Sequence, residues 1–385
     1  MKSNWQTKKI GEVLEYEQPT KYLVQSKNYN DEYRTPVLTA GKTFILGKTK
    51  EEKGIFPAKD LPVIIFDDFT TATKFVDFPF KVKSSAMKIL HPIKEISDAK
   101  FIFYVMQDIN FDHIGIHKRY WISEYSRIEI LIPPLHEQRR IVKILDEVFE
   151  KMAKVKENAE KNLKNAEELF ESYLQNVFAK PGKEWEDKKL KDIFQIKPPK
   201  KEAREKLKDD DLVSFVPMED MQIFSKEFIC NKERKLKEVQ GSYTYFANED
   251  VLLAKITPCF ENGKLGIARN LKNGIGFGSS EYIVFRSNGK VISDYLYYFL
   301  AREQFRKEGA KRMSGAVGHK RVSKEFIEES ILPFPKSLSE QKSIVKKLDT
   351  LSAETKKLEA IYKKKLADLE ELKKSVLKKA LSGEL

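Results

Sequence analysis

The sequence contains little cysteine and histidine and no long apolar run. Two cysteines, Cys230 and Cys259, among 385 residues exclude a disulfide-stabilised scaffold and fit a reducing compartment. These cysteines and the five scattered histidines show no zinc-ligand spacing. No apolar run approaches the roughly 20 residues of a membrane-spanning helix, and the start, MKSNWQTKKIGEV, lacks the apolar core of a signal peptide. We expect a soluble, cytoplasmic protein without a metal site or a membrane partner.

Catalytic signatures of nucleic-acid enzymes are also missing. The sequence has no G-x-x-x-x-G-K-[ST] phosphate loop, no Pro-Pro-aromatic tetrapeptide of adenine methyltransferases and no glycine-rich loop suited to S-adenosylmethionine. Asp67-Asp68, and Asp220 with residues 233–235, loosely resemble nuclease carboxylates, but solvated surface acids are the simpler interpretation. Cys259 is better explained as a small packed residue than as a nucleophile. The sequence predicts a non-catalytic recognition protein, with an autonomous nuclease as an alternative.

The composition is basic and apolar enough to fold. Hydrophobic residues make up 41% and charged residues 34%, which argues against wholesale disorder. The net charge is +13, and such an excess favours a polyanionic partner, most often nucleic acid. A lysine-rich solvated surface explains the composition equally well.

An internal repeat organises the chain, and repeats decide the fold before any local pattern does. The strongest block recurs at a constant shift of 203 residues: Glu137-Gln138, Ile141-Val142 and Leu145-Asp146 return as Glu340-Gln341, Ile344-Val345 and Leu348-Asp349. Four weaker matches keep the same order. Trp5 with residues 10–13 returns as Trp185 with residues 190–193, and residues 96–98 return as 292–294. Residues 117–119 return as 319–321, and residues 131–133 return as 331–333. Five matches in one order indicate a duplication.

Each repeat has a mixed front and a helical back. The fronts contain strand-like apolar runs, such as residues 63–66, 251–254 and 282–285, separated by glycine and proline, and one shorter helical stretch at about 294–307. We predict an α+β fold with a first domain at 1–135, a spacer helix at 136–180, a second domain at 181–338 and a second spacer helix at 339–385. Pro133-Pro134 and residues 333–335 are expected to end the strands before the helices.

The two backs show a heptad-like rhythm that is typical of a coiled coil. The predicted seam of the first helix comprises Ile141, Leu145, Val148, Met152, Val155, Ala159, Asn162, Ala166, Leu169 and Tyr173, and that of the second comprises Ile344, Leu348, Leu351, Thr355, Leu358, Tyr362, Lys365, Leu369, Leu372 and Val376. Pairing within the chain, antiparallel, would give two globular ends separated by a two-helix spacer, with a pseudo-twofold duplication. Intermolecular helix dimers are the alternative.

Two polar residues fall in the predicted seam. Asn162 and Lys365 occupy equivalent positions, 203 residues apart. A polar seam residue lowers stability but can fix the register of a coiled coil. A tolerated polar position explains the pair equally well.

Positive charge concentrates on the two fronts. Residues 1–135 carry a net charge of +3 and residues 181–338 carry +6, whereas the first helix is neutral and the second carries +4. The stretch 309–324 combines three glycines with Lys311-Arg312, Lys320-Arg321 and Lys324. Glycine lets a backbone approach phosphates, and lysine and arginine neutralise them. A DNA-contacting loop is our prediction, because a His-Lys-Arg triplet recurs at 117–119; an ordinary flexible surface loop is the alternative.

With these residues in view, the sequence resembles the specificity (S) subunit of type I restriction–modification systems over essentially its whole length. The resemblance rests on the segment Ile132–Val142 (IPPLHEQRRIV), its second copy at 332–345, the ending at 379–385, and the segments 84–90, 278–285 and 315–322. The second copy departs from the first by three extra residues between Pro333 and Glu340. The double occurrence of these motifs in order makes the resemblance specific.

The resemblance implies a division of labour among subunits. Each globular unit would be a target recognition domain that binds one half of an asymmetric bipartite sequence in double-stranded DNA, and the antiparallel helices would set the gap. Two modification (M) subunits would dock on the chain and methylate adenine with S-adenosylmethionine, with or without two restriction (R) subunits that use ATP and Mg²⁺. The chain itself would bind no cofactor. A two-domain DNA-binding regulator or scaffold outside restriction–modification is the alternative.

The predicted DNA contacts follow from charge and repeat symmetry. Lysine and arginine in loops would hold phosphates, while some side chains would read base edges. The candidates are Lys118, Arg119, Lys320 and Arg321, with Lys74, Lys311 and Arg312 as weaker choices.

Overall fold

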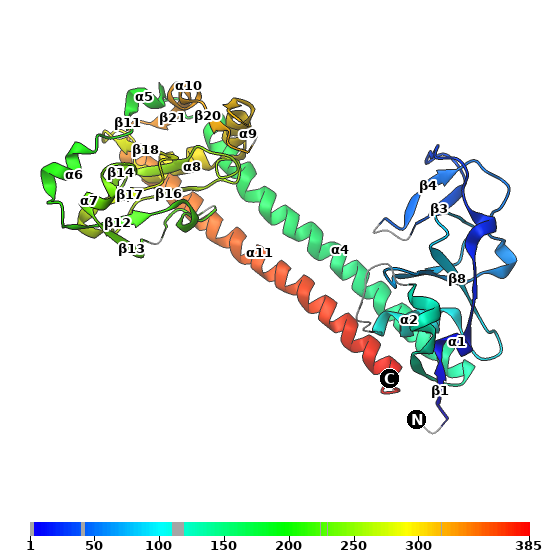
Figure 1. Ribbon diagram of the computed structural model, residues 1–385. Coiled ribbons are helices and arrows are strands. Elements are labelled where there is room, and N and C mark those ends of the chain that lie inside the picture. Colours follow the sequence, from blue (N-terminus) through cyan, green and yellow to red (C-terminus); the bar gives the residue numbers. More distant parts are fainter. Residues whose placement is uncertain (1–3, 40–42, 110–118, 224, 229, 317) are drawn as a thin grey trace. The chain divides into compact units, whose positions relative to one another are not determined.

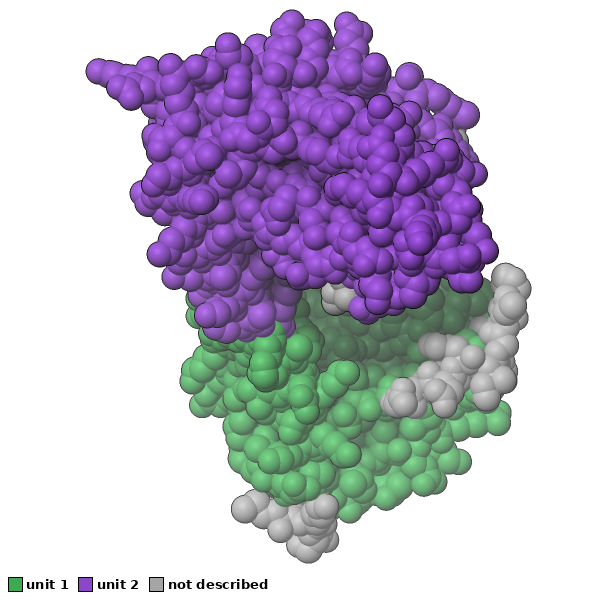
Figure 2. Space-filling view, turned by 90° about the vertical axis from the view of Figure 1, so that its left-hand side faces the viewer, with its two compact units in different colours: residues 1–160, 364–385 green, residues 161–363 purple. Residues whose placement is uncertain are grey.

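The computed structural model describes residues 4–39, 43–109, 119–223, 225–228, 230–316 and 318–385 (Figure 1). The chain divides into two compact units, which Figure 2 colours separately: residues 1–160 with 364–385 form unit 1, and residues 161–363 form unit 2. Each unit holds one mixed domain and one segment of each long helix, which confirms the predicted α+β class. In the described part of the chain, no helix is both long enough and apolar enough to cross a membrane.

The domain of unit 1 is built on two sheets and a ribbon. The larger sheet is entirely antiparallel, in the order β2 (Leu14–Glu17), β8 (Met87–Pro92), β5 (Val63–Asp67), β6 (Thr73–Val76). The second sheet is mixed, in the order β4 (Ile45–Thr49), β3 (Thr35–Leu38), β7 (Lys81–Val82). The ribbon pairs β1 (Gln6–Lys9) with β9 (Glu129–Ile132), and the α-helices of the domain are α1 (Ile10–Val13), α2 (Ala99–Asp108) and α3 (Tyr120–Ser123).

The central strand β5 explains why this domain has two cores. All five of its residues are buried, since both faces of the sheet are covered. Ile64 and Phe66 pack into the cluster that contains the helices, whereas Val63 and Ile65 pack into the cluster between the two sheets. Because successive strand residues point to opposite faces, the continuous apolar run of β5 serves both cores.

Unit 2 repeats the two sheets and the ribbon of unit 1 and, among the described strands, has one additional strand in its second sheet and an additional two-stranded hairpin. Its larger sheet has the order β11 (Phe194–Ile196), β18 (Tyr282–Ser287), β15 (Val251–Ala254), β16 (Leu265–Ile267). Its second sheet has the order β13 (Lys232–Lys235), β12 (Leu212–Val216), β17 (Ile275–Gly278), β14 (Thr244–Ala247), of which β14 has no counterpart among the described strands of unit 1. The other elements are the ribbon β10 (Trp185–Lys189) with β21 (Ile331–Pro335), the hairpin β19 (Met313–Ser314) with β20 (Arg321–Val322), and the helices α5 (Leu190–Ile193), α6 (Lys201–Lys206), α7 (Leu236–Val239), α8 (Ser293–Ala301), α9 (Glu303–Lys311) and α10 (Lys324–Glu329).

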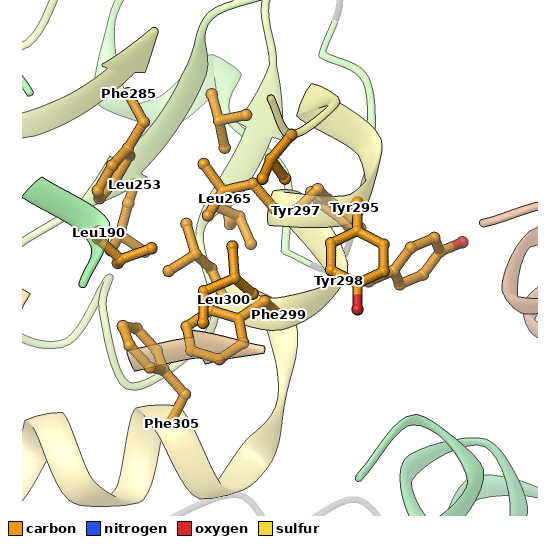
Figure 3. Packing of buried hydrophobic residues seen from close by; sticks show 14 of the residues in the cluster. Leu190, Leu253, Leu265, Phe285, Tyr295, Tyr297, Tyr298, Phe299, Leu300 and Phe305 are labelled. Atoms are coloured by element: carbon orange, nitrogen blue, oxygen red, sulfur yellow. The ribbon is translucent and has the colours of Figure 1, made fainter. Parts of the chain in front are cut away.

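The main core of unit 2 lies between its larger sheet and its helices. Figure 3 shows Leu253 and Phe285 of the sheet close to Leu300 and Phe299 of α8. The predicted single helix at about 294–307 is wrong, because Arg302 has extended backbone geometry and separates α8 from α9. The guanidinium of Arg302 lies 4.1 Å from the Phe299 ring centroid, so a cation–π contact forms where the two helices are separated.

The long helices α4 (Leu135–Ala179) and α11 (Leu338–Leu381) pair antiparallel within the chain. In unit 1, Ile141 and Leu145 of α4 share a core cluster with Leu377 and Ala380 of α11. In unit 2, the C-terminal part of α4 instead shares a cluster with the N-terminal part of α11, through Leu174, Phe178, Val345 and Leu348. Residue numbers therefore rise along α4 as they fall along α11, which confirms intrachain pairing over intermolecular dimers.

The strict heptad register predicted for the seam is wrong at seven of its twenty positions. Leu169 is 52% exposed, and the residues that bury there are Ala166 and, in part, Phe170. An α-helix has 3.6 residues per turn, so a seven-residue repeat drifts by about 20° per heptad, or about 80° over the four heptads from Ile141 to Leu169. The same drift exposes the other wrongly placed seam residues: Val155, Asn162, Tyr173, Leu358, Lys365 and Leu372.

The prediction that two polar residues lie in the seam is also wrong. Asn162 and Lys365 are both exposed, so neither fixes the register of a buried seam. The remaining predicted seam residues are buried or half-buried: Ile141, Leu145, Val148, Met152, Ala159 and Ala166 on α4, and Ile344, Leu348, Leu351, Thr355, Tyr362, Leu369 and Val376 on α11.

A buried glutamine attaches each long helix to its domain. Gln138 is 0% exposed; its Oε1 accepts from Asp98 N at 2.8 Å, and its Nε2 donates to Ile96 O and Pro133 O, both at 2.8 Å. Gln341 repeats these bonds, accepting from Ile292 N at 3.0 Å and donating to Lys290 O and Pro335 O, both at 2.9 Å. The repeated Glu-Gln motif thus contains a side chain that connects the start of the helix to two other segments.

The repeated aspartate forms a second attachment about two turns further along each helix. Asp146 accepts from the Tyr104 hydroxyl at 2.5 Å and from Lys100 Nζ at 2.7 Å. Asp349 accepts from the Tyr298 hydroxyl at 2.5 Å and from Lys226 Nζ at 2.7 Å. The tyrosine lies on α2 in unit 1 and on α8 in unit 2, whereas the lysine comes from different elements.

These bonds correct two of the five sequence matches. Asp98 and Ile292 make equivalent bonds to the glutamines, so the recurring Ile-Ser-Asp tripeptide is offset by two residues in space. Pro133 is likewise equivalent to Pro335 rather than to Pro333. The predicted strand ends are confirmed: β9 ends at Ile132, directly before Pro133, and β21 ends at Pro335, although this strand includes Pro333. A two-stranded ribbon tolerates proline because alternate backbone N–H groups face away from the partner strand.

Candidate nucleic-acid interface

The end of the central strand forms an equivalent backbone junction in both units. In unit 1, Asp68 follows β5; its N–H donates to Ala86 O at 3.2 Å, and its carbonyl accepts from Tyr120 N at 3.0 Å. In unit 2, Lys255 follows β15; its N–H donates to Glu281 O, and its carbonyl accepts from Val322 N, both at 2.9 Å. We call these two sets of three residues the strand-end junctions.

The junctions place Arg119 and Arg321 at equivalent positions. Each arginine comes directly before the residue whose N–H closes the junction, Tyr120 or Val322. Both arginine side chains are exposed. The arginine of the recurring His-Lys-Arg triplet is therefore in register with the fold, unlike the Ile-Ser-Asp tripeptide.

The side chains at the two junctions differ in charge and burial. In unit 1, Asp68 is buried; its Oδ1 accepts from Trp121 N at 2.9 Å, and its Oδ2 lies 3.4 Å from Nζ of the equally buried Lys88. In unit 2, Glu281 instead forms a partly exposed ion pair with Arg321 and lies 3.9 Å from Lys255 Nζ. The hydrogen bond from Arg321 is the largest influence lowering the pKa of the Glu281 carboxyl.

The paired acids Asp67 and Asp68 are buried, so the expectation of solvated surface acids is wrong for them. Their bonds are structural: Asp67 Oδ1 accepts from Phe69 N at 2.8 Å and from Thr70 N at 2.7 Å, which fixes the turn between β5 and β6. An aspartate that bonds backbone N–H groups two and three residues ahead is a common turn former. Among the described residues, no group of three or more His, Cys, Asp or Glu is placed to hold a metal ion.

That fixed turn presents an aromatic residue that the sequence reasoning missed. Phe69 lies in the turn held by Asp67, directly before two threonines, and its side chain is 42% exposed. It is adjacent in sequence to the junction residue Asp68, whose carbonyl anchors the segment after Arg119. A phenylalanine following two aspartates at the end of an apolar strand was the available signal. An exposed aromatic here can contact a thymine methyl group or stack on a base.

Beside the junction of unit 2 lies a basic cleft of about 490 Å³. Its lining includes the junction residues Lys255 and Val322 together with three tyrosines and three further lysines: Tyr243, Tyr245, Tyr282, Lys197, Lys200 and Lys324. Burial and the positive charges of Lys197 and Arg204 lower the pKa of Lys200. Lysines interleaved with aromatic rings suit a nucleic-acid backbone.

The structure places the other predicted DNA contacts at different points. Lys118 lies outside the described residues. Lys320 is exposed directly before Arg321, and its carbonyl accepts from Thr257 N at 2.9 Å. Lys311 and Arg312 are exposed at the C-terminal end of α9, where the Arg312 guanidinium lies 5.2 Å from the Phe326 ring centroid.

Lys74 is separated from the junction along the strand. It lies exposed on β6, with its Nζ 5.8 Å from the Phe44 ring centroid, so it reaches toward the second sheet. Of the seven candidates, Arg119, Lys320 and Arg321 are thus the described ones that adjoin the junctions.

Comparisons with known proteins agree with the duplication. The family model described as "Type I restriction modification DNA specificity domain" matches the chain twice, at residues 2–165 and 182–369. The chain therefore belongs to the type I restriction–modification DNA specificity family. Two matches in one chain correspond to the two domains with their repeated topology.

Individual relatives agree over different lengths. The EcoR124I/EcoR124II specificity subunit of Escherichia coli is 52% identical over 146 residues, which is 36% of this chain and 36% of that subunit. The chain thus matches about a third of the length of that relative. The MjaVIII specificity subunit of Methanocaldococcus jannaschii is 23% identical over 425 aligned positions, covering 99% of this chain and 93% of that subunit.

Solved structures share the fold over the whole chain. A chain from the work titled "Structural basis underlying complex assembly and conformational transition of the type I R-M system" matches with a TM-score of 0.69 at 19% identity, covering 100% of this chain and 99% of that one. The HsdS subunit from Thermoanaerobacter tengcongensis matches with a TM-score of 0.55, also at 19% identity, covering 100% of this chain and 98% of that one.

Proposed function

We propose that this chain is the DNA-recognition subunit of a type I restriction–modification complex, with each domain binding one half of a bipartite DNA sequence. The observation that carries the proposal is the duplicated strand-end junction, which presents an exposed arginine at the same point of each domain. Family membership and the net positive charge of both domain segments support it.

The two half-sites should differ in sequence. Identical readers would bind a palindrome, by the symmetry that relates dimeric proteins to their operators. Here the side chains at the junctions are different: a buried Asp68–Lys88 pair in one unit, and Lys255 with the Arg321–Glu281 pair in the other. Different side chains at equivalent points favour an asymmetric target.

The chemistry of the complex would belong to partner subunits. We infer that two modification subunits dock on the chain and methylate adenine with S-adenosylmethionine, and that restriction subunits, where present, use ATP and Mg²⁺. Methylation requires the adenine to leave the base stack, a step that would be carried out by the modification subunit. No cofactor is assigned to this chain.

The helix pair offers apolar side chains for such docking. Leu169 and Tyr173 on α4, and Leu358 and Ile361 on α11, are exposed in unit 2. Residues four apart, or three apart, lie on one side of a helix, so each pair forms a small apolar patch. Replacing Leu169 and Ile361 with serine should reduce co-purification of the modification subunit, and an unchanged yield would contradict this docking surface.

Methylome sequencing tests the proposed function. The chain would be co-expressed with the modification subunit from its own host in a bacterium without adenine methylation. We expect methylation of one bipartite, asymmetric motif that appears only when both proteins are present. A motif that does not depend on this chain would refute the proposal. Binding to an uninterrupted site without any methylation would instead support the regulator alternative.

A further inference from the structure

The guanidinium of Arg321 is held in one orientation by a carboxylate. Its Nε donates to Glu281 Oε2 at 2.9 Å and its Nη2 donates to Glu281 Oε1 at 2.7 Å, while Nη1 donates to His319 O at 3.2 Å. Arg321 begins β20, and Glu281 directly precedes β18. The carboxylate therefore occupies the side edge of the guanidinium, and after these three bonds one hydrogen on Nη1 and one on Nη2 remain to donate.

Solvent limits what this pair adds to stability, because the side chain of Arg321 is 47% exposed and that of Glu281 is 21% exposed. Its two parallel hydrogen bonds also fix the orientation of the guanidinium. Glu281 lies close to a second cation, Lys255, whose Nζ donates to Ser280 O at 3.0 Å. The carboxylate is thus itself fixed between a lysine and an arginine.

A phosphate contact fits this arrangement poorly. Phosphate binding depends on net positive charge, whereas Glu281 neutralises Arg321 and would repel a phosphate next to it. Reading a base depends instead on a donor pair at a fixed angle. Guanine presents the acceptors O6 and N7 in the major groove, and a bidentate arginine is their commonest partner.

We propose that Arg321 reads a guanine in the half-site bound by unit 2, and that Glu281 is the residue that positions it. This inference rests on the proposed DNA-recognition function. Exposed Lys320, directly before Arg321, supplies the adjacent phosphate contact. In unit 1 the position of Glu281 is taken by Ala86, so Arg119 has no carboxylate at that point and serves as a phosphate contact.

The test compares Arg321→Lys, Glu281→Gln and Lys320→Ala in the full chain, co-expressed with its modification subunit in a methylation-free bacterium. Methylome sequencing of the wild type first defines both half-sites. Arg321→Lys and Glu281→Gln should then both lose discrimination, by about five- to 100-fold, at the same guanine of one half-site. The other half-site should stay unchanged. Lys320→Ala should lower methylation at all sites without altering the motif.

Three results would overturn the inference: a uniform loss of methylation in Arg321→Lys with the motif intact, unchanged methylation in that variant, or relaxation at different positions in the two variants. Thermal unfolding of each variant, compared with the wild type, identifies a folding defect. Should Arg321→Lys misfold, Arg321→Gln with Glu281→Gln keeps the comparison decisive, because the two neutral side chains can still bond each other. Failure of the wild type to direct any bipartite methylation would refute the proposed function instead.

Discussion

The buried glutamine Gln341 is expected to carry much of the attachment of α11 to its domain. Replacing it with leucine removes three hydrogen bonds, to Ile292 N, Lys290 O and Pro335 O, inside a site that is 0% exposed. A net contribution of about 1 kcal/mol per bond gives a loss of about 3 kcal/mol, and backbone groups left buried without partners would add to it. Leucine keeps the volume, so the loss reflects hydrogen bonding rather than a cavity.

Calorimetry of the full chain measures this loss. For a unit of about 200 residues, 1 kcal/mol shifts the transition by about 2–4 °C, so we expect the transition of unit 2 to fall by about 6–12 °C. Gln195→Leu is the matched control, since Gln195 is exposed on β11 of the same unit. A fall of less than about 2 °C in Gln341→Leu, or an equal fall in the control, would refute the reasoning. Gln138→Leu should act in the same way on unit 1.

Three further predictions concern the helices and the junction of unit 1. Inserting seven residues into both helices, after Glu160 and before Lys364, should lengthen the gap of the methylated motif by about three base pairs, because seven residues rise about 10.5 Å; an unchanged gap would contradict a spacer role. Phe170→Ala should lower the free energy of unfolding by about 2 kcal/mol, whereas Leu169→Ala should change it by less than about 0.5 kcal/mol in urea titrations; the reverse order would restore the heptad register. Phe69→Ala should weaken methylation about tenfold without changing thermal stability, and an unaffected methylome would remove Phe69 from the interface.

The repeat shows how far local sequence similarity can be trusted. The Glu-Gln and Leu-Asp blocks aligned correctly because their side chains make tertiary bonds that both copies need. The Ile-Ser-Asp tripeptide aligned two residues out of register, since Asp98 caps α2 whereas Asp294 binds Lys226 and Arg269. Identical residues in two repeats are therefore not structurally equivalent when their side chains make different bonds.

The candidate site was predicted in part. Repeat symmetry pointed to Arg119 and Arg321, and the junctions place them at equivalent points. The partner of Arg321 could not be predicted, because Glu281 lies 40 residues away in the sequence and meets it only where both segments bond the backbone of Lys255. Phe69 was missed for a related reason, because the residue type alone does not show whether an apolar side chain is buried or exposed.

The sequence by itself determined the duplication, the α+β class and the presence of two long helices, whereas the structure decided that these helices pair within the chain. The duplication, the class and the helices follow from hydrophobic periodicity and repeated blocks, which are properties of the chain read along its length. Only the tertiary structure decided which helix residues are buried, since a small angular drift per heptad accumulates until Leu169 and Lys365 face solvent. It also decided which charges neutralise one another. Arg321 and Glu281 belong to segments that do not pair with each other, and they meet because both segments are hydrogen-bonded to the backbone of Lys255.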